Sequence, residues 1–110
     1  MTSTNYLTRK EELILLAVYK LGDSASLVKI RELLNISTGR EWTMGNVYVP
    51  LDRMTKLDFL ETRVGEPTSR RGGKAVKYYG LSREGKEALA ELRKIHETLW
   101  EGISDPAFDK

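Results

Sequence analysis

Residues 60–89, LETRVGEPTSRRGGKAVKYYGLSREGKEAL, constrain the fold of this chain more than any other stretch. Two runs with aromatic and β-branched content, 59–64 and 75–81, have strand character and flank a tip that contains glycine and proline. Ser82 follows the second run, and serine is a favoured cap for the start of a helix. The stretch therefore predicts a β-hairpin that leads directly into a final helix over about 83–102.

The same stretch is basic. It carries seven Lys or Arg residues and four Glu residues, whereas the whole chain has a formal net charge of only +2. A local excess of positive charge on a hairpin favours contact with nucleic acid. The candidate contacts at its tip are Arg70, Arg71 and Lys74, and the alternative is that these charges serve only solubility.

Two helices are predicted at the start of the chain. The sequence TRKE at 8–11 matches a capping box in front of a helix over 9–21, and a glycine follows that helix. Apolar residues recur at helical spacing over about 27–37, which predicts a second amphipathic helix. Either Ser24 or Ser26 is expected to cap it.

A third helix is predicted over 43–57, with Thr43 as its cap. Pro50 falls inside it, and an interior proline costs a helix about 3 kcal/mol. One continuous helix is favoured because the apolar stripe passes through the proline without a change of phase; the alternative is a 3₁₀-like turn over 43–48 and a separate helix from about 49. The stripe consists of Met44, Val47, Leu51 and Met54.

Composition restricts the function classes. The chain has 110 residues, which suits one domain, and it has no cysteine and one histidine, so thiolate catalysis, disulfides and an ordinary zinc site are not expected. No convergent catalytic group is visible, and we predict that the chain is not an enzyme and needs no cofactor or metal. The apolar run near the N-terminus is too short for a membrane span, so the cytoplasm is the expected location.

Helix, helix, helix, hairpin, helix is the element order of a winged helix-turn-helix domain. Four segments carry more than this order: EELILLAVYKLGD at 11–23, KIRELL at 29–34, TGREWTMGNVYVPLDRMTKLDFLE at 38–61 and GEPTSRRGGKAVKYYGLSREGKEAL at 65–89. With these segments, residues 11 to about 90 resemble the PadR family of bacterial transcriptional regulators.

The resulting fold prediction is mainly α with a small β-hairpin wing. An N-terminal helix and a winged helix-turn-helix domain are expected over 1–82, a C-terminal dimerisation helix over 83–103 and a tail over 104–110. In a winged helix of this kind, the third helix enters the major groove of double-stranded DNA. Its candidate DNA contacts are Thr43, Asn46, Tyr48, Arg53 and Lys56.

The final helix carries an apolar stripe that a domain of this size has little core to cover, which indicates pairing with a second copy of the chain. The resemblance implies the same, since PadR proteins dimerise through this helix with help from the N-terminal one. The expected interface residues are Leu89, Leu92, Ile95, His96, Leu99, Trp100 and Ile103. Because some members hold a flat hydrophobic effector there, Trp100 is also a candidate ligand wall.

Together, these expectations predict that the chain is a homodimeric, sequence-specific DNA-binding regulator. It is expected to repress transcription by binding a pseudo-palindromic operator. An alternative of a different class remains: a winged-helix module that binds a protein partner or an effector and has no operator of its own.

Overall fold

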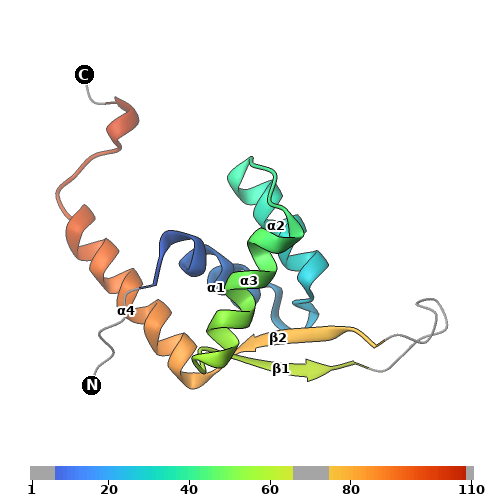
Figure 1. Ribbon diagram of the computed structural model, residues 1–110. Helices are drawn as coiled ribbons and strands as arrows, with labels where there is room; N and C mark the ends of the chain where they lie inside the picture. The colour runs from blue at the N-terminus through green and yellow to red at the C-terminus, as the bar shows by residue number, and fades with distance from the viewer. Residues whose placement is uncertain (1–6, 66–74, 109–110) are drawn as a thin grey trace.

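The computed structural model describes residues 7–65 and 75–108 (Figure 1). The predicted order of elements is confirmed. It runs α1 (Arg9–Leu21), a 3₁₀ turn η1 (Gly22–Ser24), α2 (Leu27–Thr38), α3 (Met44–Lys56), β1 (Leu60–Val64), β2 (Lys77–Leu81), α4 (Arg83–Trp100) and a 3₁₀ turn η3 (Pro106–Phe108). The predicted hairpin tip, with its three basic contacts, lies outside the described residues.

Local side-chain hydrogen bonds fix where the first two helices begin. The Thr8 hydroxyl accepts from the Glu11 amide at 3.1 Å and the Glu11 carboxylate accepts from the Thr8 amide at 3.0 Å, so the predicted capping box is present. At α2 the cap is Ser26, whose hydroxyl accepts from the Lys29 amide. Ser24, the other candidate, belongs to η1 and donates to a carbonyl of the preceding helix instead.

The third helix is continuous through Pro50, so the alternative of a turn followed by a separate helix is wrong. Val47, Leu51 and Met54 are fully buried on its inner side. Their packing holds the helix together although the proline has no amide hydrogen to donate to the carbonyl of Asn46, four residues earlier.

One core joins the three N-terminal helices to the hairpin. It contains apolar residues from α1, α2, α3 and both strands, with Tyr79 of β2 among them. Tyr79 is buried and the adjacent Tyr78 is partly exposed, because neighbouring residues of a strand lie on opposite faces. The strands pair antiparallel, with Leu60 opposite Leu81 and Val64 opposite Lys77.

The hairpin passes into α4 through a single residue. The Ser82 amide donates to the carbonyl of Phe59, its hydroxyl donates to the carbonyl of Asp58 at 2.5 Å, and that hydroxyl also accepts from the amide of Gly85. Gly85 packs so closely on the chain before β1 that a Cβ atom there would overlap the carbonyl oxygen of Phe59. The start of α4 is therefore fixed to the base of the hairpin.

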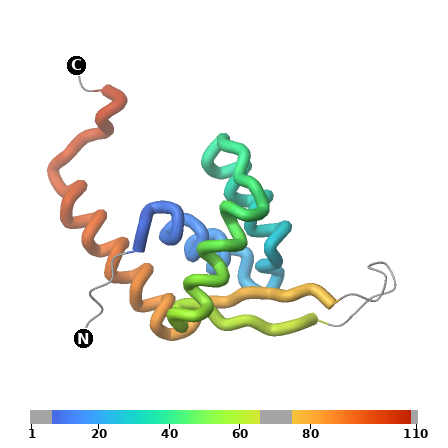
Figure 2. Tube along the Cα trace, viewed as in Figure 1, coloured from blue at the N-terminus to red at the C-terminus, as the bar shows by residue number. Residues whose placement is uncertain are grey.

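Beyond its first turns, α4 leaves the core. Figure 2 shows the hairpin and α4 extending from opposite sides of the helical body. The helix ends at Trp100, two residues earlier than predicted, and the expected tail contains η3, in which the Phe108 amide donates to the carbonyl of Asp105. Within the part of the chain that the structure describes, no helix has the length and apolar content needed to cross a membrane.

Candidate nucleic-acid interface

The outer face of α3 is an exposed stripe opposite the core. Asn46, Val49, Arg53 and Lys56 follow one another at spacings of three or four residues, which places them on one side of a helix. All four are exposed, whereas Val47, Leu51 and Met54 are fully buried. The burial pattern thus separates a core face from a face that is free to contact a partner.

The N-terminus of α3 lies at one end of this stripe. The Thr43 hydroxyl accepts from the Asn46 amide at 3.0 Å, so Thr43 is the cap that the sequence predicted. Thr43, Met44 and Gly45 are all exposed. The amides of the first helical turn carry partial positive charge, which suits a phosphate group at this end.

Arg53 forms an ion pair across two helices. Its guanidinium donates to the carboxylate of Glu11, the same group that closes the capping box with Thr8. The Glu11 side chain is 8% exposed, while that of Arg53 is 57% exposed. One side of the guanidinium is therefore held by a buried acid and the other side faces solvent.

Lys56 also has an acidic partner. Its ammonium lies 3.0 Å from the carboxylate of Asp52, one turn earlier on α3. This hydrogen bond and the charge of Asp52 raise the pKa of Lys56 above its ordinary value. Both predicted cations of the stripe are thus paired with carboxylates within the chain.

Tyr48 lies beside the stripe, in the wall of a groove between the start of α2, α3 and β2. The groove has a volume of about 460 Å³, and Lys29 and Lys77 also line it. Sequence reasoning did not single out Lys29, because on α2 it has the pattern of an ordinary exposed lysine paired with Glu32. Its place beside Tyr48 depends on the packing of three elements.

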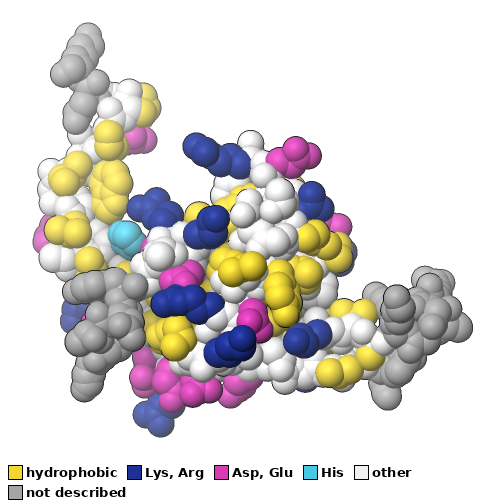
Figure 3. All heavy atoms as spheres, in the orientation of Figure 1, with side chains coloured by type: hydrophobic (Ala, Val, Ile, Leu, Met, Phe, Trp, Pro, Cys, Tyr) yellow, Lys and Arg dark blue, Asp and Glu magenta, His cyan; other side chains and the backbone are white. Residues whose placement is uncertain are grey.

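Charge on this side of the molecule is mixed. Figure 3 shows Lys and Arg side chains spread over the face that carries α3, with acidic side chains between them and apolar side chains near its centre. On the hairpin, Arg63 lies over the ring of Tyr78 at 4.6 Å and donates to the carbonyl of Asp23 at 2.7 Å. Arg63 therefore fixes the hairpin against η1.

Comparison with known proteins gives matches in structure. No family model matches the chain, and no curated protein matches it in sequence. A PadR-like transcription factor from Bacteroides fragilis is 28% identical, with a TM-score of 0.72 over 86% of this chain and 89% of that one. The present chain therefore has the fold of the PadR-like regulators. A PadR-like regulator from Bacillus cereus also matches at a TM-score of 0.72, with 20% identity over 91% of this chain and 92% of that one.

The PadR-like resemblance predicted from the sequence is therefore confirmed, and so is the winged helix-turn-helix fold. The neighbours are transcription factors, a non-enzymatic group, in agreement with the prediction that the chain is not an enzyme. A more distant neighbour, the S. aureus MepR F27L mutant, was solved bound to an oligodeoxyribonucleotide; it is 17% identical, with a TM-score of 0.62 over 92% of this chain and 69% of that one.

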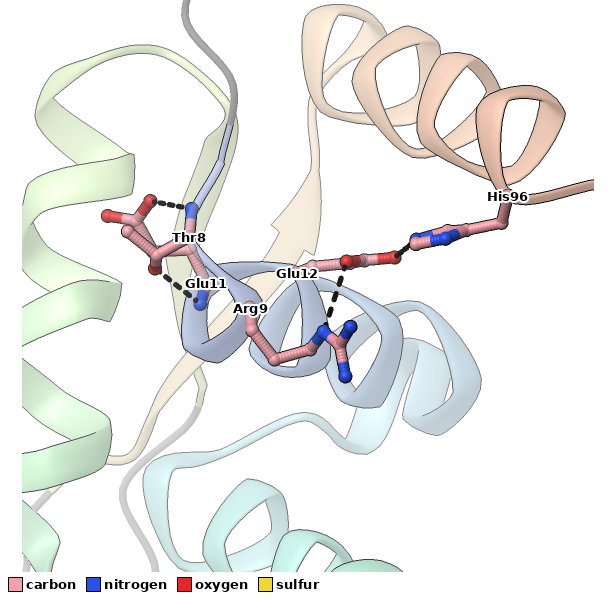
Figure 4. A network of polar contacts seen from close by, with 5 residues as sticks. All are labelled: Thr8, Arg9, Glu11, Glu12 and His96. Carbon is pink, nitrogen blue, oxygen red and sulfur yellow. Dashed lines mark hydrogen bonds and ion pairs between the residues drawn. The ribbon is translucent and has the colours of Figure 1, made fainter. Parts of the chain in front are cut away.

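At the other end of the molecule, α4 contacts α1 through a histidine. His96 lies 3.0 Å from the carboxylate of Glu12, and Arg9 lies 4.0 Å from the same carboxylate (Figure 4). Leu16 and Tyr19 continue the stripe of α1 that Glu12 begins, and both are exposed. The contact places an apolar face of α1 beside α4.

The expected interface residues of the last helix divide into three groups, and one of them, Ile103, lies beyond the end of α4 at Trp100. Leu89 is 9% exposed and belongs to the core of the single chain. Leu92, Ile95 and His96 are partly exposed, and the most exposed residues are Leu99, Trp100 and Ile103. Exposed apolar area thus increases toward the end of the helix, away from the core.

Proposed function

We propose that this chain is a sequence-specific DNA-binding transcriptional regulator that acts as a homodimer in the cytoplasm. The observation that carries the proposal is the exposed stripe of α3, opposite a fully buried apolar stripe and next to a hairpin wing. A helix presented in this way fits the major groove of B-form DNA, which is wide enough to admit it.

The predicted contacts then have distinct roles. Thr43 and the exposed first turn of α3 hold a phosphate, and Asn46 and Tyr48 contact base edges or the adjacent backbone. Arg53 and Lys56 contact phosphates with the sides of their charges that face solvent. Beyond the described residues, Arg70, Arg71 and Lys74 are proposed to contact DNA from the wing.

Dimerisation completes the proposed function. At least half of each residue is exposed in Leu99, Trp100 and Ile103, at 68%, 50% and 56%. A second α4 would cover them, since exposed apolar groups of this size favour association. Two α3 helices related by a two-fold axis would then contact the half-sites of a pseudo-palindromic operator, and occupation of that operator would repress transcription.

An effector that releases the DNA is the further part of the proposal. Trp100 has a half-exposed indole at the proposed interface, and such a ring would stack on a flat hydrophobic ligand held between two copies. The effector would change the geometry of the dimer and thereby the affinity for the operator.

Selection of fragments from the source genome, followed by fluorescence polarisation, tests DNA binding. We expect the affinity to fall steeply as the salt concentration rises. Lys56→Ala should reduce the slope of log K against log salt by about 1, the contribution of one phosphate contact. Lys94→Ala, an exposed lysine on α4, is the matched control and should leave the slope unchanged. Absence of binding to every fragment at low salt would overturn the proposal and favour a protein-interaction or effector-sensing module.

A further inference from the structure

Val49 lies near the middle of the exposed stripe of α3, three residues after Asn46 and four residues before Arg53. It is 64% exposed, although the rest of the stripe is polar. Valine loses side-chain freedom in a helix, so neither core packing nor helix propensity explains a valine at this place. Its two methyl groups are presented outward with the groups that face DNA in the proposed function.

The cations of the stripe are poorly placed to discriminate bases. Arginine distinguishes guanine by donating to it with both arms of its guanidinium. The Arg53 guanidinium already donates to Glu11, and Lys56 is 3.0 Å from Asp52. A base-specific contact by either residue would require it to give up a carboxylate partner, which leaves the neutral side chains of the stripe to recognise sequence.

Asn46 and Val49 have complementary chemistry for this task. An asparagine amide pairs with the N6 and N7 atoms of adenine, and the C5 methyl of thymine is the apolar group on the major-groove edge that a valine methyl can contact. Residues three apart on a helix have Cβ atoms about 5–6 Å apart on the same face. In zinc fingers, helix side chains spaced by three or four positions contact successive bases of the major groove. Both side chains can therefore contact adjacent positions of one half-site.

We propose that Val49 determines sequence specificity by packing against the C5 methyl of a thymine in each half-site, next to the base pair that Asn46 contacts. This inference rests on the proposed function and adds to it the chemical class of the operator: an A·T-containing half-site with a thymine methyl at a defined position.

The test uses an operator chosen by selection with the full-length protein. Each thymine is replaced in turn by deoxyuridine, which removes only the C5 methyl, and binding is measured for the unchanged protein, Val49→Ala and Ile36→Ala. We expect a single deoxyuridine, at one defined position of either half-site, to weaken binding of the unchanged protein about fourfold, the effect of one buried methyl group. Val49→Ala removes the contact from both half-sites of the homodimer, so it should weaken binding of the thymine operator about sixteenfold and be indifferent to that replacement.

Ile36 is an apolar residue of α2 that is 81% exposed, so Ile36→Ala should keep the full thymine dependence. Alanine favours the helix more than valine does, and Val49→Ala is expected to fold normally, which circular dichroism checks. If the operator binds but no deoxyuridine weakens binding, or Val49→Ala keeps the same dependence, the inference is wrong while the proposed function stands. If no DNA binds, both fail.

Discussion

Glu11 and Arg53 are 42 residues apart in the sequence and form an ion pair that joins the start of α1 to the outer face of α3. The same carboxylate accepts the amide of Thr8, so a single buried acid both starts one helix and orients a side chain of another. The position of the exposed stripe on α3 is thereby coupled to the N-terminus of α1.

Glu11→Gln should lower the free energy of unfolding by about 1–2 kcal/mol, because glutamine keeps an oxygen for the Thr8 amide but removes the charge opposite Arg53. Chemical denaturation measures the change, and a double-mutant cycle with Arg53→Met should assign most of it to the pair. The matched control is Glu32→Gln, whose ion pair with Lys29 is exposed on both sides and should contribute less than about 0.5 kcal/mol. Equal effects of the two substitutions would contradict the assignment.

Gly85→Ala should destabilise the protein by about 3 kcal/mol, because the added Cβ would overlap the Phe59 carbonyl oxygen and that contact is with backbone. Gly45→Ala is the matched control. It lies in the first turn of α3, where a Cβ meets nothing within 4 Å, and it should stabilise the helix slightly. Thermal denaturation of both variants checks the prediction, which fails if Gly85→Ala melts at the temperature of the unchanged protein.

Stability should fall at alkaline pH in part through Tyr79. Burial, followed by the nearby Tyr48 and Asp52, raises the pKa of the Tyr79 hydroxyl above its ordinary value of 10.0. As the pH rises past that value, the unfolded chain loses this proton before the folded chain does, so the folded state loses stability until the folded pKa is passed. Below the ordinary value the contribution is constant.

Denaturation at a series of pH values tests this contribution. Tyr79→Phe should reduce the alkaline loss of stability, whereas Tyr19→Phe, which removes a hydroxyl from a residue that is 60% exposed, should not. The same alkaline slope in Tyr79→Phe and in the unchanged protein would show that other groups cause the loss.

Trp100→Ala should raise the dissociation constant of the proposed homodimer at least about tenfold, because a large aromatic ring at the centre of an interface contributes more than 1 kcal/mol. Light scattering across a range of concentrations measures it, with Lys94→Ala on the same helix as control. The indole is half exposed in the single chain, so the fold itself should survive its removal. A monomer at micromolar concentration, or no effect of Trp100→Ala, would contradict the dimer.

Local features of the fold were predictable from the sequence because they depend on residues a few positions apart. The capping box at Thr8, the cap at Thr43 and the opposite faces of Tyr78 and Tyr79 follow from helix and strand geometry alone. The choice between Ser24 and Ser26 was not predictable, since both are serines in a turn. The pairing of Ser26 with Tyr78 of β2 contributes to that choice, and it exists only in the folded chain.

The candidate site was less predictable, because its contacts join residues that are far apart in the sequence. The stripe of α3 follows from periodicity, but the partners of its charges do not: Glu11 is distant in sequence, and His96 meets Glu12 from 84 residues away. Leu89 was assigned to the dimer interface from its place in the stripe of the last helix. It lies in the core because the first turn of α4 is packed against the base of the hairpin.

Leu81 ends a strand and Arg83 begins a helix, and the Ser82 between them is hydrogen-bonded on both sides. These contacts hold the start of α4 to the base of the hairpin, so we expect a rotation of α4 to move β2 with it. In the proposed homodimer, a change in the angle at which the two α4 helices cross would be transmitted mechanically to both wings. The distance between the two hairpins would change without any rearrangement inside α3. The contacts at the ends of α4 would therefore determine which half-site spacings the dimer can bind.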